Sequence, residues 1–223
     1  MHELRRGILI VIEGIDGAGK TTQASILADK LTEEGYAVTS LKEPTDGKWG
    51  QMIRKLAING RTLPPDKESR LFLEDRREDV ENNIKPALAL KRIVVMDRYY
   101  YSNIAYQGAL GIDPESIRKL NEAFAPVPDV VIVLDVAPSI GQFRLVNGRK
   151  DTPNHFERID YLEKVRMQFQ RMEHLKNVQL VDGSRTIDAV SESVISVVHS
   201  ILKAVGESNE TGLVEGNPVS ART

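Results

Sequence analysis

Short apolar runs alternate along the chain with longer stretches of helical period. Five runs rich in β-branched residues are almost continuously apolar, at residues 8–12, 37–41, 93–96, 130–134 and 178–181. Apolar runs of this length predict strands that are buried on both faces of a parallel sheet. Apolar positions with helical spacing occur in seven stretches, at 22–34, 49–58, 66–90, 114–124, 139–147, 159–175 and 187–205. The alternation predicts an α/β fold in three layers (α/β/α), with a five-stranded parallel sheet between helices.

The pattern fits a single domain, which we place at residues 1–205 of the 223-residue chain. Residues 206–223 are rich in Gly, Ser, Asn, Glu and Thr. This composition buries too little apolar surface to order a segment, so we expect a disordered tail. The first apolar run is too short for a membrane span or a secretory signal and is followed directly by Glu13. We therefore expect a soluble, cytoplasmic protein with no membrane partner.

Charge and cysteine content argue against several classes of function. The chain has 30 basic and 32 acidic residues, mixed along its length, and a formal net charge of -2. A balance of this kind does not favour binding to nucleic acid. The sequence has no cysteine, which excludes disulfides, cysteine-ligated zinc and thiol nucleophiles.

A glycine-rich loop connects the first predicted strand to the first predicted helix. Residues 14–21 satisfy the pattern G-x-x-x-x-G-K-[ST] in the strand, loop and helix setting that the motif requires. The alternative is a glycine-rich turn that binds nothing, and this setting disfavours it. In a phosphate-binding loop, backbone N–H groups bind phosphate oxygens, Lys20 reaches the β- and γ-phosphates, and Thr21 ligates Mg²⁺. The predicted loop residues are Gly14, Ile15, Asp16, Gly17, Ala18, Gly19, Lys20 and Thr21.

Two carboxylates are candidates for a second metal ligand. Asp97 and Asp135 each close an apolar run, and a strand of this form can deliver an aspartate to the metal beside a phosphate loop. Either residue could instead cap the segment that follows it. Spacing alone does not choose between them. Arg98, directly after Asp97, favours the first, because a guanidinium beside a metal carboxylate suits two converging phosphates.

Motifs beyond the phosphate loop resemble the thymidylate kinase family. In that family's order and spacing, the chain carries Lys42-Glu43-Pro44, Phe72 with Asp75-Arg76, Asp97-Arg98-Tyr99 with Ser102, and Ala105-Tyr106-Gln107. The resemblance extends from about residue 8 to residue 205. It implies a P-loop kinase fold, ATP with Mg²⁺ as the phosphoryl donor, and a nucleoside monophosphate as the acceptor. Phosphorylation of dTMP to dTDP, in the synthesis of dTTP, is the implied reaction, and a homodimer is the implied assembly.

The resemblance also implies how the acceptor is bound. Asp16 would contact the 3′-hydroxyl of the sugar, and Tyr106 would crowd its 2′ position, so that deoxyribose is preferred. Phe72 and Arg76 are four residues apart and share a helix face, where the ring would stack on thymine and the guanidinium would bind an exocyclic oxygen. Without the resemblance, Phe72 would be interpreted as an ordinary core residue. Asn103 matches a position that bonds the edge of the base in some members.

Further arginines match positions that bind phosphate. Arg98 and Arg54 would contact the acceptor phosphate, although Arg54 could equally be a surface arginine. The basic segment 144–158 matches the family's lid over ATP. Because the phosphate loop has glycine where other members carry arginine, a lid arginine would offset the charge on the transferred group, with Arg149 the first choice and Arg158 the second. The predicted catalytic residues are then Lys20, Asp97, Arg98 and Arg149.

Two departures from the family pattern lie on the acceptor side. They follow Lys42-Glu43-Pro44 and precede Arg76, at residues 45–49 and 73–75. They bear on the identity of the base more than on the phosphoryl chemistry. A P-loop kinase of another nucleoside monophosphate or of a deoxynucleoside is therefore the first alternative. A P-loop ATPase or switch, and a nucleotide-binding regulator without activity, fit the acceptor-side and catalytic residues less well.

Overall fold

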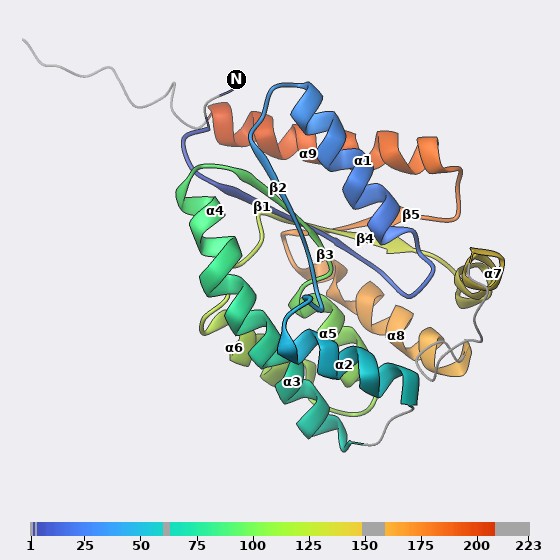
Figure 1. Ribbon diagram of the computed structural model, residues 1–223. Helices are drawn as coiled ribbons and strands as arrows, with labels where there is room; N and C mark the ends of the chain where they lie inside the picture. Colours follow the sequence, from blue (N-terminus) through green and yellow to red (C-terminus); the bar gives the residue numbers. More distant parts are fainter. Residues whose placement is uncertain (1, 3, 60–62, 149–158, 208–223) are drawn as a thin grey trace, which may run out of the picture.

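A five-stranded, all-parallel sheet forms the middle layer of the molecule (Figure 1). The computed structural model describes residues 2, 4–59, 63–148 and 159–207. The sheet has the order β2-β3-β1-β4-β5, and its strands are β1 (Ile8–Glu13), β2 (Val38–Lys42), β3 (Ile93–Asp97), β4 (Val130–Asp135) and β5 (Val178–Asp182). The predicted α/β fold with a five-stranded parallel sheet is confirmed.

The strands differ in burial according to their place in the sheet. β1 and β3 are buried along their whole length, and β4 is buried except at its last residue. β2 and β5 are only partly buried. The expectation that all five strands are buried on both faces is therefore wrong for these two. Both are edge strands, with a neighbour on one side only.

Helices cover both faces of the sheet (Figure 1). α1 (Lys20–Glu33) and α9 (Ile187–Glu207) pack side by side on one face, where α1 contacts β2 and β3 and α9 contacts β4 and β5. Most other helices lie on the opposite face. They are α2 (Lys48–Asn59), α3 (Pro65–Asp79), α4 (Lys85–Ala89), α5 (Tyr100–Gly108), α6 (Pro114–Glu122) and α8 (Ile159–Arg171), with α7 (Pro138–Gly148) at one end of the sheet.

Two segments differ from the helices that the sequence predicts. The stretch 66–90 is not one α-helix, because a π-helical turn, η1 (Val80–Ile84), separates α3 from α4. Pro86 follows this turn and has no N–H with which to continue the α-helical bonding pattern, which is consistent with a break here. Helix α5 was not predicted, since most of its residues are buried and no polar face marks its period.

The C-terminal boundaries also differ slightly from the prediction. α8 ends at Arg171 and is followed by a short 3₁₀ turn, η3 (Met172–His174). α9 continues through Gly206 and Glu207, which the sequence assigns to the tail. The rest of that predicted tail, 208–223, lies outside the described residues. Within the described residues, no helix combines the length and apolar character that crossing a membrane would need.

The order of the strands determines where ligands can bind. β1 lies between β3 and β4, at the point where the direction of the strand order reverses. In parallel sheets of this kind, ligands bind beyond the carboxyl ends of the strands at such a point. β1 and β3 pair in register, with Ile12 opposite Asp97. The loop after β1 and the residues after β3 therefore meet at one edge of the sheet, beside the start of α1.

Candidate active site

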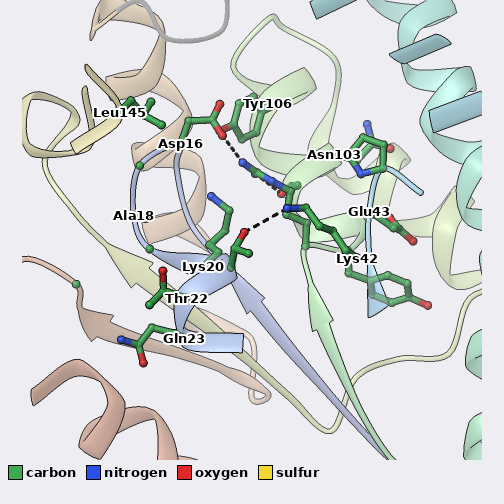
Figure 2. Close-up of a pocket in the computed structure, with 18 of the residues that line it drawn as sticks. Asp16, Ala18, Lys20, Thr22, Gln23, Lys42, Glu43, Asn103, Tyr106 and Leu145 are labelled. Carbon is green, nitrogen blue, oxygen red and sulfur yellow. Dashed lines mark hydrogen bonds and ion pairs between the residues drawn. The ribbon is translucent and has the colours of Figure 1, made fainter. Parts of the chain in front are cut away.

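A cavity of about 670 Å³ opens at this edge of the sheet (Figure 2). Its walls come from the phosphate loop, the segment after β2, helices α2, α3, α5 and α7, and the loop between β5 and α9. Thr22 and Gln23 lie on one side of it, and Glu43 and Asn103 lie on the other (Figure 2). The cavity thus extends from the phosphate loop to the helices on the opposite face of the sheet.

The backbone of the phosphate loop adopts conformations that require or favour glycine. Gly14, Gly17 and Gly19 have positive φ angles of 139°, 78° and 99°. A Cβ on Gly17 would lie 2.1 Å from the carbonyl oxygen of Gly141, so only glycine fits there. Residues 16–21 line the cavity. Gly14 is not among the lining residues, and neither is Ile15, whose side chain is in the core.

Lys20 points back into the phosphate loop. Its ammonium group donates a hydrogen bond to the carbonyl of Ile15, at 2.7 Å, and the side chain is buried. Burial, and then the positive charge of Arg98, lower the pKa of Lys20 to about 7, although nearby carboxylates oppose the change. Phosphate oxygens would favour the charged form of this lysine, because they supply the negative charge that its surroundings only partly provide.

Thr21 and Asp97 form an oxygen pair suited to a divalent cation. The Thr21 hydroxyl donates to Asp97 Oδ2 at 2.5 Å. Asp97 is only 4% exposed, and its buried Oδ1 has no hydrogen-bond partner among the described residues. The described residues contain no cluster of three or more histidine or carboxylate ligands. Magnesium ions are often held by one or two protein oxygens together with substrate phosphates and water, which fits this arrangement.

The alternative metal ligand, Asp135, is engaged elsewhere. Both of its carboxylate oxygens accept hydrogen bonds from Arg166, at 2.6 and 2.8 Å, and Gln170 donates a third at 3.2 Å. Asp135 does not line the large cavity. Of the two candidates that the sequence leaves open, the geometry therefore favours Asp97.

Lys42, at the end of β2, is a site residue that the sequence analysis did not assign. Its ammonium nitrogen lies 3.1 Å from Asp97 Oδ2 and 3.2 Å from the Thr21 hydroxyl. The side chain is more than half exposed. It therefore supplies a positive charge beside the same two oxygens that would hold a metal.

Arg98 occupies the centre of the cavity wall in an unusual backbone conformation. Its φ is 73°, a region that residues other than glycine seldom adopt, and its N–H donates to the carbonyl of Ile12. The guanidinium pairs with Asp16, donates to Ser102 Oγ at 3.1 Å and lies over the ring of Tyr106. Burial alone would raise the pKa of Asp16, but the charges of Arg98 and Lys20 lower it.

Glu13 holds the segment that follows Asp97. It is fully buried at the end of β1, and its carboxylate accepts hydrogen bonds from the backbone N–H of Tyr99 (2.8 Å) and from both the N–H (2.9 Å) and the hydroxyl (2.6 Å) of Ser102. Burial raises the pKa of Glu13, and these donors oppose that rise. The carboxylate connects the end of β1 to the start of α5, directly after Arg98.

Several of the predicted acceptor residues line the cavity outside the phosphate loop. Phe72, Arg76, Asn103 and Tyr106 all line it. Arg76 is 1% exposed. Asn103 donates to Gln107 at 2.7 Å, which leaves the Asn103 Oδ1 and Gln107 Nε2 atoms buried without a partner among the described residues. Gln107 thus belongs to the site, although the sequence analysis gave it no role.

Arg54 has contacts that fit either of its two interpretations. It lines the cavity from α2, donates to the carbonyl of Pro44 at 3.0 Å and pairs with Asp46 at 3.0 Å. Its side chain is 42% exposed. It is therefore close enough to the cavity to meet a phosphate, and its role there stays a prediction.

The predicted lid is only partly described. Residues 144–148 belong to helix α7, so the expectation of a loop over 144–158 is wrong for its first part. Arg149 and Arg158, the two lid candidates, lie outside the described residues. Arg144 on α7 lines the cavity and donates to the carbonyl of Gly183 at 2.9 Å, and Arg185 lines the same end. No local motif marks either arginine, because the fold brings them to the cavity from separate segments.

Comparisons with known proteins agree on one family. Residues 12–194 match the family model described as thymidylate kinase. A protein of Archaeoglobus fulgidus named "Probable thymidylate kinase" is 48% identical over 202 residues, covering 91% of this chain and 100% of that protein. Thymidylate kinases of Xanthomonas oryzae pv. oryzae and Xanthomonas campestris pv. campestris are 46% and 45% identical, over 89% and 88% of this chain and 84% and 85% of theirs. With a family model matched over most of its length, this chain belongs to the thymidylate kinase family.

Proposed function

We propose that this protein transfers the γ-phosphoryl group of ATP to dTMP, forming dTDP and ADP, with Mg²⁺ as the metal. Membership of the thymidylate kinase family supports this reaction. The observation that supports it best is a single cavity lined both by the phosphate loop and by three polar side chains that could bind the edge of a base. These are Arg76, Asn103 and Gln107.

The hydrogen-bonding groups of these side chains match the edge of thymine. Arg76 has N–H donors that its contacts with Glu43 and Asn121 do not use. Among the described residues, Asn103 Oδ1 is an acceptor without a hydrogen-bond partner, and Gln107 Nε2 is a donor without one. Together they present donor, acceptor and donor. Thymine presents the complementary series of a carbonyl oxygen, an N–H and a second carbonyl oxygen. Cytosine, with an amino group at one position and an unprotonated ring nitrogen, does not, so a pyrimidine with two carbonyls is favoured.

The remaining acceptor residues complete this proposal. Phe72 is half-buried on the cavity wall and can stack on the base. Asp16 and Tyr106 lie beside each other, next to Arg98 (Figure 2). In the proposed complex, Asp16 binds the 3′-hydroxyl and Tyr106 excludes a 2′-hydroxyl. Arg98 and Arg54 bind the acceptor phosphate.

The proposed mechanism uses positioning and charge. Bound Mg²⁺ would neutralise charge on the donor phosphates, held by Thr21 and Asp97. The phosphate loop and Lys20 bind the β- and γ-phosphates, and Arg98 neutralises charge as the phosphoryl group passes to the acceptor. We extend this to Arg149, or Arg158 in its place, as a lid arginine acting on the same group. The acceptor phosphate is already an anionic nucleophile, so no side chain has to remove a proton from it.

A coupled assay of ADP release tests the reaction. Purified protein is supplied with ATP, Mg²⁺ and one of dTMP, dUMP, UMP, CMP, AMP, GMP or thymidine. Fastest turnover with dTMP supports both the chemistry and the pocket. Turnover only with another acceptor would keep the phosphoryl chemistry and reject the pocket assignment, and release of ADP without any acceptor would indicate an ATPase.

Replacing Phe72 with alanine is expected to raise the KM for dTMP about tenfold or more, because base stacking on an aromatic ring is worth about 1–3 kcal/mol. The KM for ATP should not change, since Phe72 lies outside the phosphate loop. Phe124→Ala is the matched control. That ring is also partly buried and packs on an arginine, Arg77, but it does not line the cavity. Equal KM values for dTMP in the Phe72 variant and wild type would remove the stacking role.

We also propose a cytoplasmic homodimer, on the strength of the family alone. Multi-angle light scattering during gel filtration measures the assembly. A mass of two chains supports the proposal, and a mass near the 24.9 kDa of one chain would reject it.

A further inference from the structure

The base-reading arginine, Arg76, is held by two buried side chains from different parts of the chain. Its Nε and Nη2 groups both donate to Oε2 of Glu43, at 3.0 and 2.5 Å. Its Nη1 donates to Oδ1 of Asn121 at 2.6 Å. Glu43 follows β2, Asn121 lies on α6, and Arg76 itself is on α3. The guanidinium is therefore fixed by elements that are well separated in the sequence.

Each holding residue is itself fixed in place. Asn121 has no exposed surface, and its Nδ2 donates to the carbonyl of Ile117 at 2.8 Å. That bond sets the orientation of the amide, so its oxygen faces Arg76. The backbone N–H of Glu43 donates to the carbonyl of Asp97 at 3.1 Å, which ties Glu43 to the end of β3. The ring of Tyr99 lies against the guanidinium, 5.4 Å from its central carbon.

The contacts leave a defined part of Arg76 for a ligand. A guanidinium has five N–H donors, and the contacts to Glu43 and Asn121 use three of them. One N–H therefore remains on each terminal nitrogen. Arg76 lines the cavity. A donor pair of this kind can bind a carbonyl oxygen, whereas an amino group at the same place would set donor against donor.

We propose that Glu43 and Asn121 are positioning residues for Arg76, and that by fixing its guanidinium they make the enzyme select a carbonyl over an amino group on the acceptor base. This inference rests on the proposed function. A guanidinium held on one side only can rotate to place a different edge, or no edge, against the base. The side chains that hold Arg76 then affect selectivity without touching the acceptor, because a rigid donor pair rejects an amino group that a mobile one tolerates.

Asn121→Ala tests this role through binding as well as turnover. Calorimetry gives the Kd of dTMP and of dCMP for wild type and variant, and kinetics give KM and kcat. Loss of a hydrogen bond to a charged group should weaken dTMP binding about tenfold. The ratio of the dCMP Kd to the dTMP Kd should fall by a similar factor, while the KM for ATP and the kcat at saturating dTMP change little.

Two further variants separate positioning from a general loss of structure. Asn177→Ala is the matched control, because that side-chain amide likewise makes two hydrogen bonds, donated to the Tyr101 hydroxyl and the Pro128 carbonyl, but does not line the cavity or contact Arg76. It should leave both Kd values unchanged. In an Arg76→Met background, Asn121→Ala should have no further effect on the ratio, since a positioning residue acts only through its target.

Glu43→Met provides a second test if Asn121→Ala lowers the yield of folded protein. It keeps about the length of the side chain and removes the oxygen that accepts from Nε and Nη2 of Arg76, so the same fall in selectivity is expected. Wild-type selectivity and affinity in folded Asn121→Ala or Glu43→Met would overturn the positioning role and leave the proposed function standing. A wild-type protein that binds dTMP and dCMP equally would instead overturn the proposed function, and this inference with it.

Discussion

Arg98→Ala is expected to lower kcat about a thousandfold or more while the fold is retained. Charged donors aimed at a transferred phosphoryl group are typically worth 10²-fold to 10⁵-fold in rate. Arg98 is placed for this role, since it lies on the cavity wall between Asp16 and Ser102, next to the phosphate loop. Alanine keeps the Cβ of arginine and adds no cost at the positive φ of this residue. Steady-state kinetics with ATP and dTMP measure the effect.

The control for Arg98 is an arginine of similar surroundings outside the cavity. Arg166 is partly buried and bound to Asp135 by two hydrogen bonds, so Arg166→Ala removes an equivalent ion pair away from the phosphate loop. Its kcat should stay within a few-fold of wild type. If Arg98→Ala kept a comparable kcat, Arg98 would not stabilise the transferred group.

Glu13→Ala is expected to lower the free energy of unfolding by about 3–5 kcal/mol. The substitution leaves two backbone N–H groups and one hydroxyl in the interior without their acceptor. For a chain of this length, such a loss corresponds to a fall in Tm of roughly 10 °C. Thermal melting followed by circular dichroism measures it. Activity should fall as well, because the segment that carries Arg98 loses its anchor.

Glu13→Gln separates the hydrogen bonds of this residue from its charge. Glutamine retains a side-chain oxygen that can accept from the N–H groups of Tyr99 and Ser102, so most of the stability should return. A Tm for Glu13→Ala within about 2 °C of wild type would show that these buried groups find other partners, contrary to the role given to Glu13.

Local patterns were sufficient to predict the sheet and the phosphate loop. The five apolar runs match the five strands within one residue at each end, because strands buried in a parallel sheet carry a signal in their own composition. The phosphate loop was found for a similar reason, since its glycines and Lys20 lie within eight consecutive residues. Helix α5 was missed because its buried Tyr100, Tyr101 and Tyr106 leave little amphipathic contrast to detect.

Most of the site residues and contacts that the sequence patterns did not predict depend on segments that are distant in the sequence. The bond from Arg76 to Asn121 joins residues 45 apart, and the bond from Arg76 to Glu43 joins residues 33 apart. No periodicity connects such positions. Lys42, Arg144 and Arg185 likewise reach the cavity from segments that are separate in the sequence. The resemblance located Arg76 and Phe72, but only the fold shows what holds Arg76.

The most direct test of the proposed reaction is transfer of label from [γ-³²P]ATP. The protein is incubated with Mg²⁺ and labelled ATP, together with dTMP, thymidine or no acceptor, and the products are separated by thin-layer chromatography. We predict labelled dTDP with dTMP, no labelled dTMP from thymidine, and little labelled phosphate when the acceptor is omitted. Label that appeared as free phosphate at the same rate with and without dTMP, and never in dTDP, would contradict the account.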